Sequence, residues 1–204
     1  MEHDFNPVRS SPPPGSFRTA RGHAGETSNG IKLVIGLGNP GKVYENTYHN
    51  AGFLLIDYLL SKKPAIPNFE FRISKLLKPD VYMNESGGFV KKALKRKGAK
   101  PEEILIVHDD SDLALGSWKF DFDRGSAGHK GVASVINALG TKKFWRLRIG
   151  IRPKISERAP RKKADLPAEA RRAKAGEFVL KRIGVRDKKA LERVFEEIGE
   201  RLVL

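Results

Sequence analysis

The feature that most constrains this 204-residue chain is a regular alternation, from Ile31 onward, of short apolar runs with longer segments of helical periodicity. Apolar runs rich in β-branched residues that stop at glycine or polar residues predict buried strands. Apolar residues spaced three and four apart predict amphipathic helices. Strands that alternate with helices predict an α/β fold with a largely parallel or mixed sheet.

The expected elements follow from this alternation. Strands are expected over residues 31–36, 72–80, 104–107, 117–122 and 145–151. Helices are expected over residues 50–61, 84–97, 132–139 and 187–202. Gly98 and Gly140 stand where the second and third helices should end, as is common at helix C-termini. We therefore expect a single globular α/β domain over 31–204, with a twisted, mixed, mostly parallel sheet flanked by helices.

Two segments differ from this pattern. Residues 1–30 combine proline, serine, glycine and charges without an apolar period, which predicts a disordered N-terminal extension. Its arginines are typical of organelle targeting segments, whereas its acidic residues are not, so cytoplasmic and mitochondrial locations both stay open. Residues 152–175 are rich in lysine and arginine and predict a basic loop. That loop is either a phosphate-binding segment or a solvated linker.

Composition restricts the partners. Lysine and arginine number 39 against 24 acidic residues, which gives a net charge of +15. This excess favours a polyanionic partner, nucleic acid before an anionic membrane, with a solvated basic surface as the alternative. No apolar run is long enough to span a bilayer and no secretory signal is evident, so we expect a soluble intracellular protein. The absence of cysteine excludes disulfides, thiolate metal sites and thiol catalysis.

The run Gly36-Leu-Gly-Asn-Pro-Gly41 has the glycine spacing of a dinucleotide-binding fingerprint. That fingerprint requires a helix to open at once, so that the helix N-terminus meets a pyrophosphate. Pro40 and the aperiodic residues after it argue against such a helix. We expect instead a tight loop that needs glycine for its backbone conformation.

Histidines and carboxylates supply the candidate chemistry. His49 precedes a predicted helix, His129 lies at another helix start, and the acidic run 108–112 follows a predicted strand. The run could bind Mg²⁺, could orient a catalytic histidine through Asp109, or could be a solvated turn. No G-x-S-x-G motif is present, so a serine nucleophile of the α/β-hydrolase type is not expected. A hydrolase built here would activate water with a histidine and an aspartate.

Two asparagines also lie where predicted elements end. Asn39 follows the first strand and Asn84 opens a helix. Asparagine amides can hold a peptide backbone or polarise an ester carbonyl. With His49 and Asp109 nearby, the sequence predicts an esterase site.

At this point the chain resembles the bacterial-type peptidyl-tRNA hydrolases. The resemblance covers nearly all of residues 31–204, and its motifs occur in the family's order. The motifs are Gly36–Gly41, Tyr48–Gly52, Lys78–Asn84 with Ser86-Gly87, Ile106–Leu113, Gly128-His129, Arg146–Ile151 and Phe178–Leu180. The family fold is a single α/β globule like the one expected above.

The resemblance implies roles for particular residues. It implies that His49 is the catalytic base and that Asp109 is its carboxylate partner. It implies substrate-binding roles for Asn39, Tyr44, Met83, Asn84, Gly128, His129 and Lys130. It implies that Lys119 and Arg148 bind a tRNA phosphate. The implied substrate is peptidyl-tRNA, contacted at its acceptor stem and CCA end by a monomer without metal or cofactor.

Three positions depart from the family's pattern. Lys130 stands where the family usually has asparagine, and Asp121 stands where it usually has a second phosphate-binding cation. The stretch between Ser61 and Lys78 is short by about one hairpin, which predicts an exposed sheet edge. These departures keep an alternative open: an RNA-binding relative without catalysis, such as an organelle splicing factor or a ribosome-associated factor.

Overall fold

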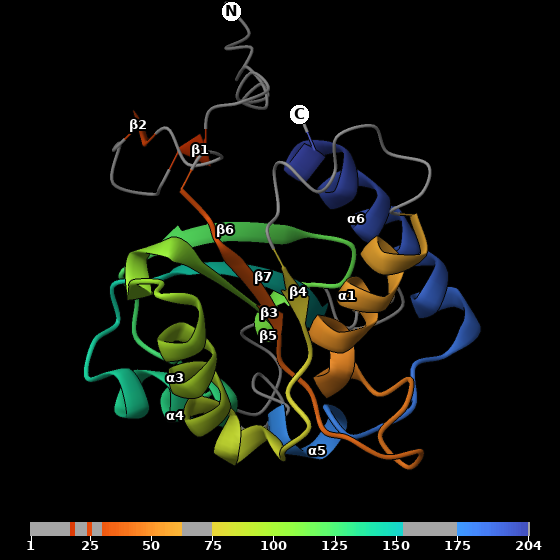
Figure 1. The fold of residues 1–204 in the computed structure, drawn as a ribbon. Coiled ribbons are helices and arrows are strands. Elements are labelled where there is room, and N and C mark those ends of the chain that lie inside the picture. Colours follow the sequence, from red (N-terminus) through yellow and green to blue (C-terminus); the bar gives the residue numbers. More distant parts are fainter. Residues whose placement is uncertain (1–16, 19–23, 26–29, 63–74, 153–174, 204) are drawn as a thin grey trace, which may run out of the picture.

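A five-stranded sheet with helices on both faces forms the body of the protein (Figure 1). The computed structural model describes residues 17–18, 24–25, 30–62, 75–152 and 175–203. The strands of the sheet, in spatial order, are β4 (Leu76–Leu77), β3 (Leu33–Gly36), β5 (Ile104–Ala114), β7 (Trp145–Arg152) and β6 (Trp118–Phe122). The first four run parallel, and β6 is antiparallel to β7. The predicted α/β class and mixed, mostly parallel sheet are confirmed.

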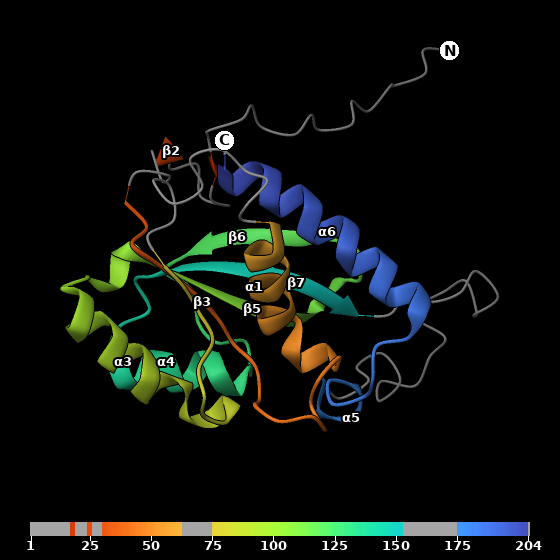
Figure 2. The same cartoon turned by 45° about the vertical axis from the view of Figure 1, so that its right-hand side comes forward.

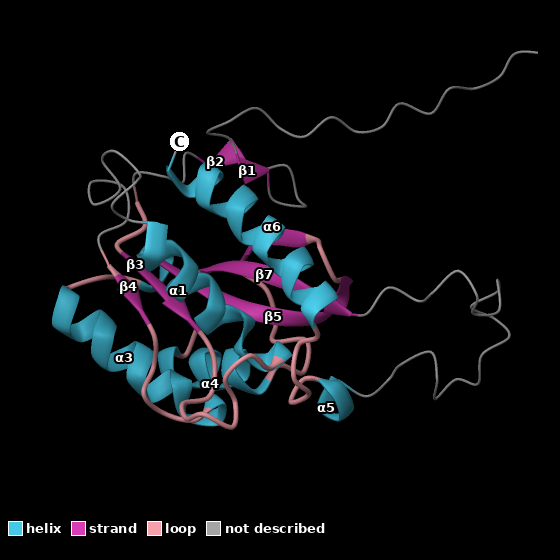
Figure 3. Cartoon of the chain, turned by 90° about the vertical axis from the view of Figure 1, so that its right-hand side faces the viewer, coloured by secondary structure: helices cyan, strands magenta, loops and turns pink. Residues whose placement is uncertain are grey.

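Two helices pack on each face of the sheet. Helices α1 (Ala51–Lys62) and α6 (Val185–Val203) lie on one face, and α3 (Ser86–Lys97) and α4 (Lys130–Leu139) lie on the other (Figures 1 and 2). Figure 3 shows the sheet between these two helical layers. Gly98 and Gly140 follow α3 and α4 with φ of 59° and 69°, so both predicted helix ends are confirmed.

Short elements complete the described chain. Three are 3₁₀ turns, η1 (Tyr48–Asn50), η3 (Met83–Glu85) and η4 (Pro101–Glu103). A short helix, α5 (Ala175–Phe178), precedes α6. A separate antiparallel pair consists of β1 (Phe17–Arg18) and β2 (Ala24–Gly25).

Alternation along the strands divides the core into two clusters. Val34 and Leu105 contribute to the cluster under α1 and α6, whereas Ile35 and Ile106 contribute to the cluster under α3 and α4. All four side chains are buried, because a strand covered on both faces must be apolar on both sides. This explains why these strands read as continuous apolar runs in the sequence.

Strand β5 is longer than the sequence indicates, and this matters for the site. The apolar run ends at Val107, but pairing with β7 continues through Asp110 opposite Gly150 and resumes at Ala114 after an irregularity. The acidic run is therefore strand for most of its length, and the solvated-turn interpretation is wrong. Carboxylates are tolerated there because each buried one meets cationic or hydrogen-bonding partners.

Glycines near the end of β3 let the first helix approach the sheet closely. A Cβ at Gly36 would lie 2.4 Å from the carbonyl oxygen of Gly52 in α1, and one at Gly38 would lie 2.6 Å from the Phe53 ring. Within the run 36–41, only Gly41 has a positive φ, of 102°. The expectation that backbone conformation alone requires these glycines is thus wrong for Gly36 and Gly38. As expected, no helix opens directly after β3.

Some expectations fall on residues that the structure does not describe. The N-terminal extension is described only at β1, β2 and Gly30, and most of the predicted basic loop, 153–174, lies outside the described residues. The same holds for 63–74 in the shortened stretch. Strand β4, which follows that stretch, is an edge strand of the sheet.

Candidate functional site

A cavity of about 710 Å³ opens where the loops after β3 and before α4 meet the polar half of β5. Every residue predicted for catalysis or substrate binding lines it: Asn39, Tyr44, His49, Met83, Asn84, Asp109, Gly128, His129 and Lys130. These residues come from segments far apart in the chain. The structure thus brings these residues together at one edge of the sheet.

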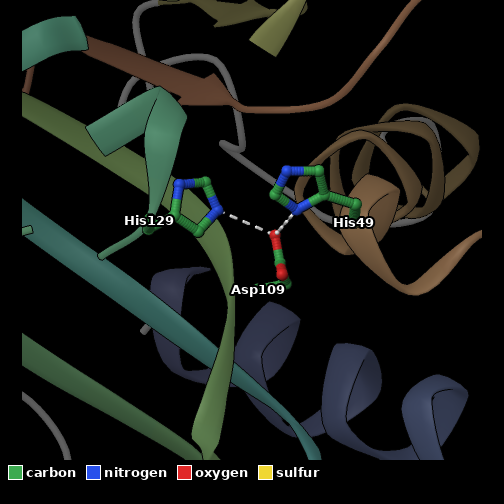
Figure 4. A group of neighbouring side chains, drawn as sticks. All are labelled: His49, Asp109 and His129. Atoms are coloured by element: carbon green, nitrogen blue, oxygen red, sulfur yellow. Dashed lines mark hydrogen bonds and ion pairs between the residues drawn. The ribbon is translucent and has the colours of Figure 1, made fainter. Parts of the chain in front are cut away.

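Two histidines converge on one carboxylate in this cavity (Figure 4). His49 Nδ1 and His129 Nε2 each lie 2.9 Å from the same oxygen, Oδ1 of Asp109. The Asp109 side chain is 3% exposed, whereas that of His49 is 13% exposed. The carboxylate is thus buried behind a histidine ring that reaches the cavity.

The hydrogen bonds assign a proton to each ring. An ionised carboxylate only accepts, so both nitrogens that face Asp109 must donate. His129 Nδ1 accepts from the backbone N–H of Val132, at 3.2 Å, and this bond caps the N-terminus of α4. Both nitrogens of His129 are therefore engaged. Among the described residues, Nε2 of His49 has no hydrogen-bond partner, so it is the ring nitrogen free to accept a proton.

Backbone contacts fix His49 in place. Its N–H donates to the carbonyl of Val179 at 2.8 Å, which ties the segment before α1 to the segment after α5. The ring also packs 5.0 Å, centroid to centroid, from that of His129. A histidine held from three directions keeps one orientation toward the cavity.

Asn39 is held with its amide nitrogen free. Its backbone exchanges two hydrogen bonds with the Asn50 side chain, at 2.8 and 2.9 Å, and its Oδ1 accepts from the N–H of Met83 at 2.8 Å. Because the oxygen is engaged, the amide nitrogen is left to donate within the cavity. Asn84 lines the same cavity and is exposed.

Electrostatics keep Asp109 ionised. Burial alone would raise the pKa of this carboxyl, but the electrostatic interaction and hydrogen bond with His129 and the hydrogen bond with His49 hold the pKa far below its usual range. The neighbouring His108 is also buried, and its Nδ1 lies 2.7 Å from the Asp109 carbonyl. Burial, and after it the electrostatic interaction with His129, lowers the pKa of His108 to about 3. A neutral His108 thus lies beneath an anionic Asp109.

The same three side chains could also hold a metal ion, since their ligand atoms lie within 4.8 Å of one another. Two hydrogen bonds to one carboxylate oxygen explain that spacing without an ion. The Mg²⁺ interpretation of the acidic run is not supported, because its carboxylates do not converge. Asp109 faces the histidines, whereas Asp110 faces Arg148.

Arg148 lies in a buried ion-pair group rather than on the surface. Its Nε donates to Asp110 at 2.7 Å and its Nη1 donates to Asp121 at 2.6 Å, with the side chain 6% exposed. Neither Arg148 nor the exposed Lys119, its register partner on β6, lines the cavity. Two ion pairs hold the buried Arg148 side chain within the protein, so this geometry by itself does not favour the predicted phosphate-binding role. Asp121, noted as a departure, is one of the two carboxylates that pair with Arg148.

Some site residues were not predicted from the sequence. Tyr82, Ser126 and Leu180 line the cavity, and Asn50 orients Asn39. The Asn50 and Leu180 positions lie inside motifs that carry the resemblance, which was the available signal. Tyr82 also lies inside one of these motifs, Lys78–Asn84, whereas Ser126 lies in none of them.

Comparisons with known proteins agree with this geometry. A sequence model of the family described as peptidyl-tRNA hydrolase matches residues 33–203. A peptidyl-tRNA hydrolase of Aquifex aeolicus is 46% identical over 140 residues, which cover 62% of this chain and 73% of the relative. One from Neisseria meningitidis is 42% identical over 140 residues, or 61% and 71% of the two chains. The crystal structure of the Acinetobacter baumannii peptidyl-tRNA hydrolase matches with a TM-score of 0.68 at 28% identity, and covers 87% of this chain and 89% of that one.

Proposed function

Because the chain belongs to the peptidyl-tRNA hydrolase family, we propose that His49 and Asp109 are the catalytic pair with which it hydrolyses the ester bond of peptidyl-tRNA. The observation that carries this assignment is the one imidazole nitrogen on the cavity lining that has no hydrogen-bond partner among the described residues. His129 uses both ring nitrogens within the protein, whereas His49 uses one and keeps Nε2 for the cavity. A general base needs such a nitrogen within reach of its proton donor.

The proposed reaction needs only groups that line the cavity. His49 Nε2 takes a proton from a water molecule as the oxygen attacks the ester carbonyl carbon, and Asp109 stabilises the imidazolium that forms. The free amide nitrogen of Asn39 donates to the carbonyl oxygen, where negative charge develops. The carbon–oxygen bond to the terminal ribose then breaks, and the imidazolium returns its proton to the leaving ribose oxygen. The products are a peptide carboxylate and tRNA with a free terminal hydroxyl.

The remaining substrate contacts are proposals of the same kind. Tyr44, Met83, Asn84, Gly128, His129 and Lys130 line the cavity and would contact the peptide and the CCA end. Lys130 brings a cation where the family usually has asparagine, so it would meet an RNA phosphate rather than a peptide amide. We assign the buried Arg148 to structural support and leave Lys119 as the exposed phosphate-binding candidate on β6.

The proposed substrate indicates where the protein acts. Peptidyl-tRNA is made by ribosomes, so we place the protein inside the cell, in the cytoplasm or in mitochondria. No helix in the described part of the chain is long and apolar enough to cross a membrane. A monomer suffices for the proposed reaction, since one chain supplies all the groups named above.

The test is single-turnover cleavage of an N-blocked aminoacyl-tRNA by wild type and two matched histidine variants. His49→Ala should lose about 10²–10⁴-fold in rate, the usual contribution of a general base, with tRNA binding kept. His129→Ala should lose much less, because it removes a second donor to Asp109, the cap of α4 and a proposed substrate contact but leaves His49 in place.

Each other outcome has a definite meaning. A greater loss in His129→Ala than in His49→Ala would refute the assignment of the base. Salt-dependent tRNA binding by a wild type that cleaves nothing would favour the non-catalytic alternative.

A further inference from the structure

One face of helix α3 is uniformly basic. Its exposed side chains include four cations in two pairs spaced four residues apart: Lys91, Lys92, Lys95 and Arg96. We call these four residues the α3 basic face. Helix α3 contains no acidic residue, and none of the four cations forms an ion pair with another described residue.

This pattern does not serve the helix itself. Like charges spaced four apart destabilise a helix by about 0.2–0.5 kcal/mol per pair, and the α3 basic face holds two such pairs. Cations in the last turn of a helix are favoured by its dipole, but Lys91 and Lys92 lie in the middle of α3.

The excess of positive charge is also specific to α3. Helix α6, on the opposite face of the sheet, carries five cations and five acids in 19 residues. A general surplus of surface charge would not distinguish the two helices. A local function of the α3 basic face would explain this difference between the two helices.

The α3 basic face leads away from the cavity. Turn η3, with Met83 and Asn84, lines the cavity, and α3 begins at the next residue, Ser86. At 1.5 Å per residue, Lys91 lies about 8 Å and Arg96 about 15 Å along the axis from Ser86. Helix α4 packs beside α3 and also starts at the cavity, with Lys130. A polyanion that leaves the cavity along α3 therefore passes the α3 basic face.

We propose that the α3 basic face binds the phosphate backbone of the tRNA body while the ester bond lies in the cavity. This inference rests on the proposed function, because it takes peptidyl-tRNA as the occupant of the cavity. Lysine and arginine side chains on a convex helix contact phosphates without reading sequence. Such contacts suit an enzyme that must accept many tRNAs.

The experiment compares two double variants that remove the same charge. Lys91→Gln/Lys95→Gln neutralises one pair of the α3 basic face, and Lys189→Gln/Arg193→Gln neutralises an exposed pair of equal spacing on α6. Binding of deacylated tRNA is measured against salt concentration. Removal of each phosphate-binding cation should lower the slope of log K against log salt by about 1, so the slope should fall by about 2 in the α3 variant and hardly at all in the α6 variant.

Cleavage assays distinguish a failure of this proposal from a failure of the proposed function. For N-blocked aminoacyl-tRNA, the α3 variant should show a KM raised about tenfold with kcat within about twofold of wild type. For an N-acylated aminoacyl ester of adenosine, which lacks the RNA body, it should match wild type. Loss on this small substrate would indicate a folding defect and would overturn the proposal.

Equal tRNA binding by the α3 and α6 variants at every salt concentration would also overturn the proposal and leave the proposed function intact. A wild type that cleaves neither substrate would refute the proposed function. The binding comparison would still decide whether the α3 basic face is an RNA surface.

Discussion

Removal of the Asp121 carboxylate tests whether the ion-pair group around Arg148 is structural. Asp121→Ala takes away the acceptor 2.6 Å from Arg148 Nη1 and leaves that buried N–H without its partner. Breaking a buried pair from one side costs about 3–5 kcal/mol. Since Asp110 still accepts from Nε, we expect Asp121→Ala to lower the free energy of unfolding by about 2–4 kcal/mol. Arg124 approaches Asp121 only at 3.8 Å on the surface, so its loss adds little.

The assay is urea and thermal unfolding of a double-mutant cycle. For a domain of this size the expected loss corresponds to a fall in Tm of roughly 5–15 °C. On an Arg148→Met background, Asp121→Ala should lower the free energy of unfolding by at least about 1.5 kcal/mol less than it does on wild type, because the cation that paired with Asp121 is already absent. Asp112→Ala, an exposed carboxylate of the same acidic run, is the control and should change stability by under about 0.5 kcal/mol. A loss below about 1 kcal/mol, or equal losses on the two backgrounds, would refute the reasoning.

Two further predictions concern the packing of α3 against α4 and the buried side chain of His108. Gly87→Ala should lower the free energy of unfolding by about 2 kcal/mol or more, because its Cβ would lie 2.1 Å from the Ser134 carbonyl oxygen where α3 and α4 meet. Gly88 has open space around it, so Gly88→Ala should stabilise α3 by about 0.5–1 kcal/mol. Chemical denaturation of both variants checks these values. Burial lowers the pKa of His108 to about 3, below its unfolded value, so only the unfolded state gains a proton there as pH falls from about 6.5 toward 3. Stability should therefore be fully present above pH ~6.5 and should decrease below it by up to about 1.4 kcal/mol per pH unit. A His108→Gln variant whose unfolding free energy depends as steeply on pH between 6.5 and 4.5 as that of wild type would contradict the assignment.

The sequence by itself determined the order and type of the main elements. Apolar runs such as Ile104–Val107 and helical periods such as 187–202 are local signals, and the helices they predicted begin and end within two residues of the observed ones. Glycine at 98 and 140 marked helix ends because few other residues adopt a positive φ at low cost. The resemblance to peptidyl-tRNA hydrolases placed the right residues around one cavity, because its motifs occupy the loops that meet at the carboxyl ends of the strands.

Only the tertiary structure decided what those polar residues do to one another. Strand pairing with β7 carried the acidic run into the sheet, which no local pattern indicated, since carboxylates disfavour strands unless partners are brought from elsewhere. Asp121 and Arg148 are 27 residues apart, and pairing between β6 and β7 turned an apparent loss of positive charge into a buried ion pair. Nδ1 of His49 likewise faces Asp109, 60 residues further along the chain, and this contact leaves Nε2 as the ring nitrogen toward the cavity. Hydrogen-bond partners across the sheet are set by register and packing, and a linear sequence does not state them.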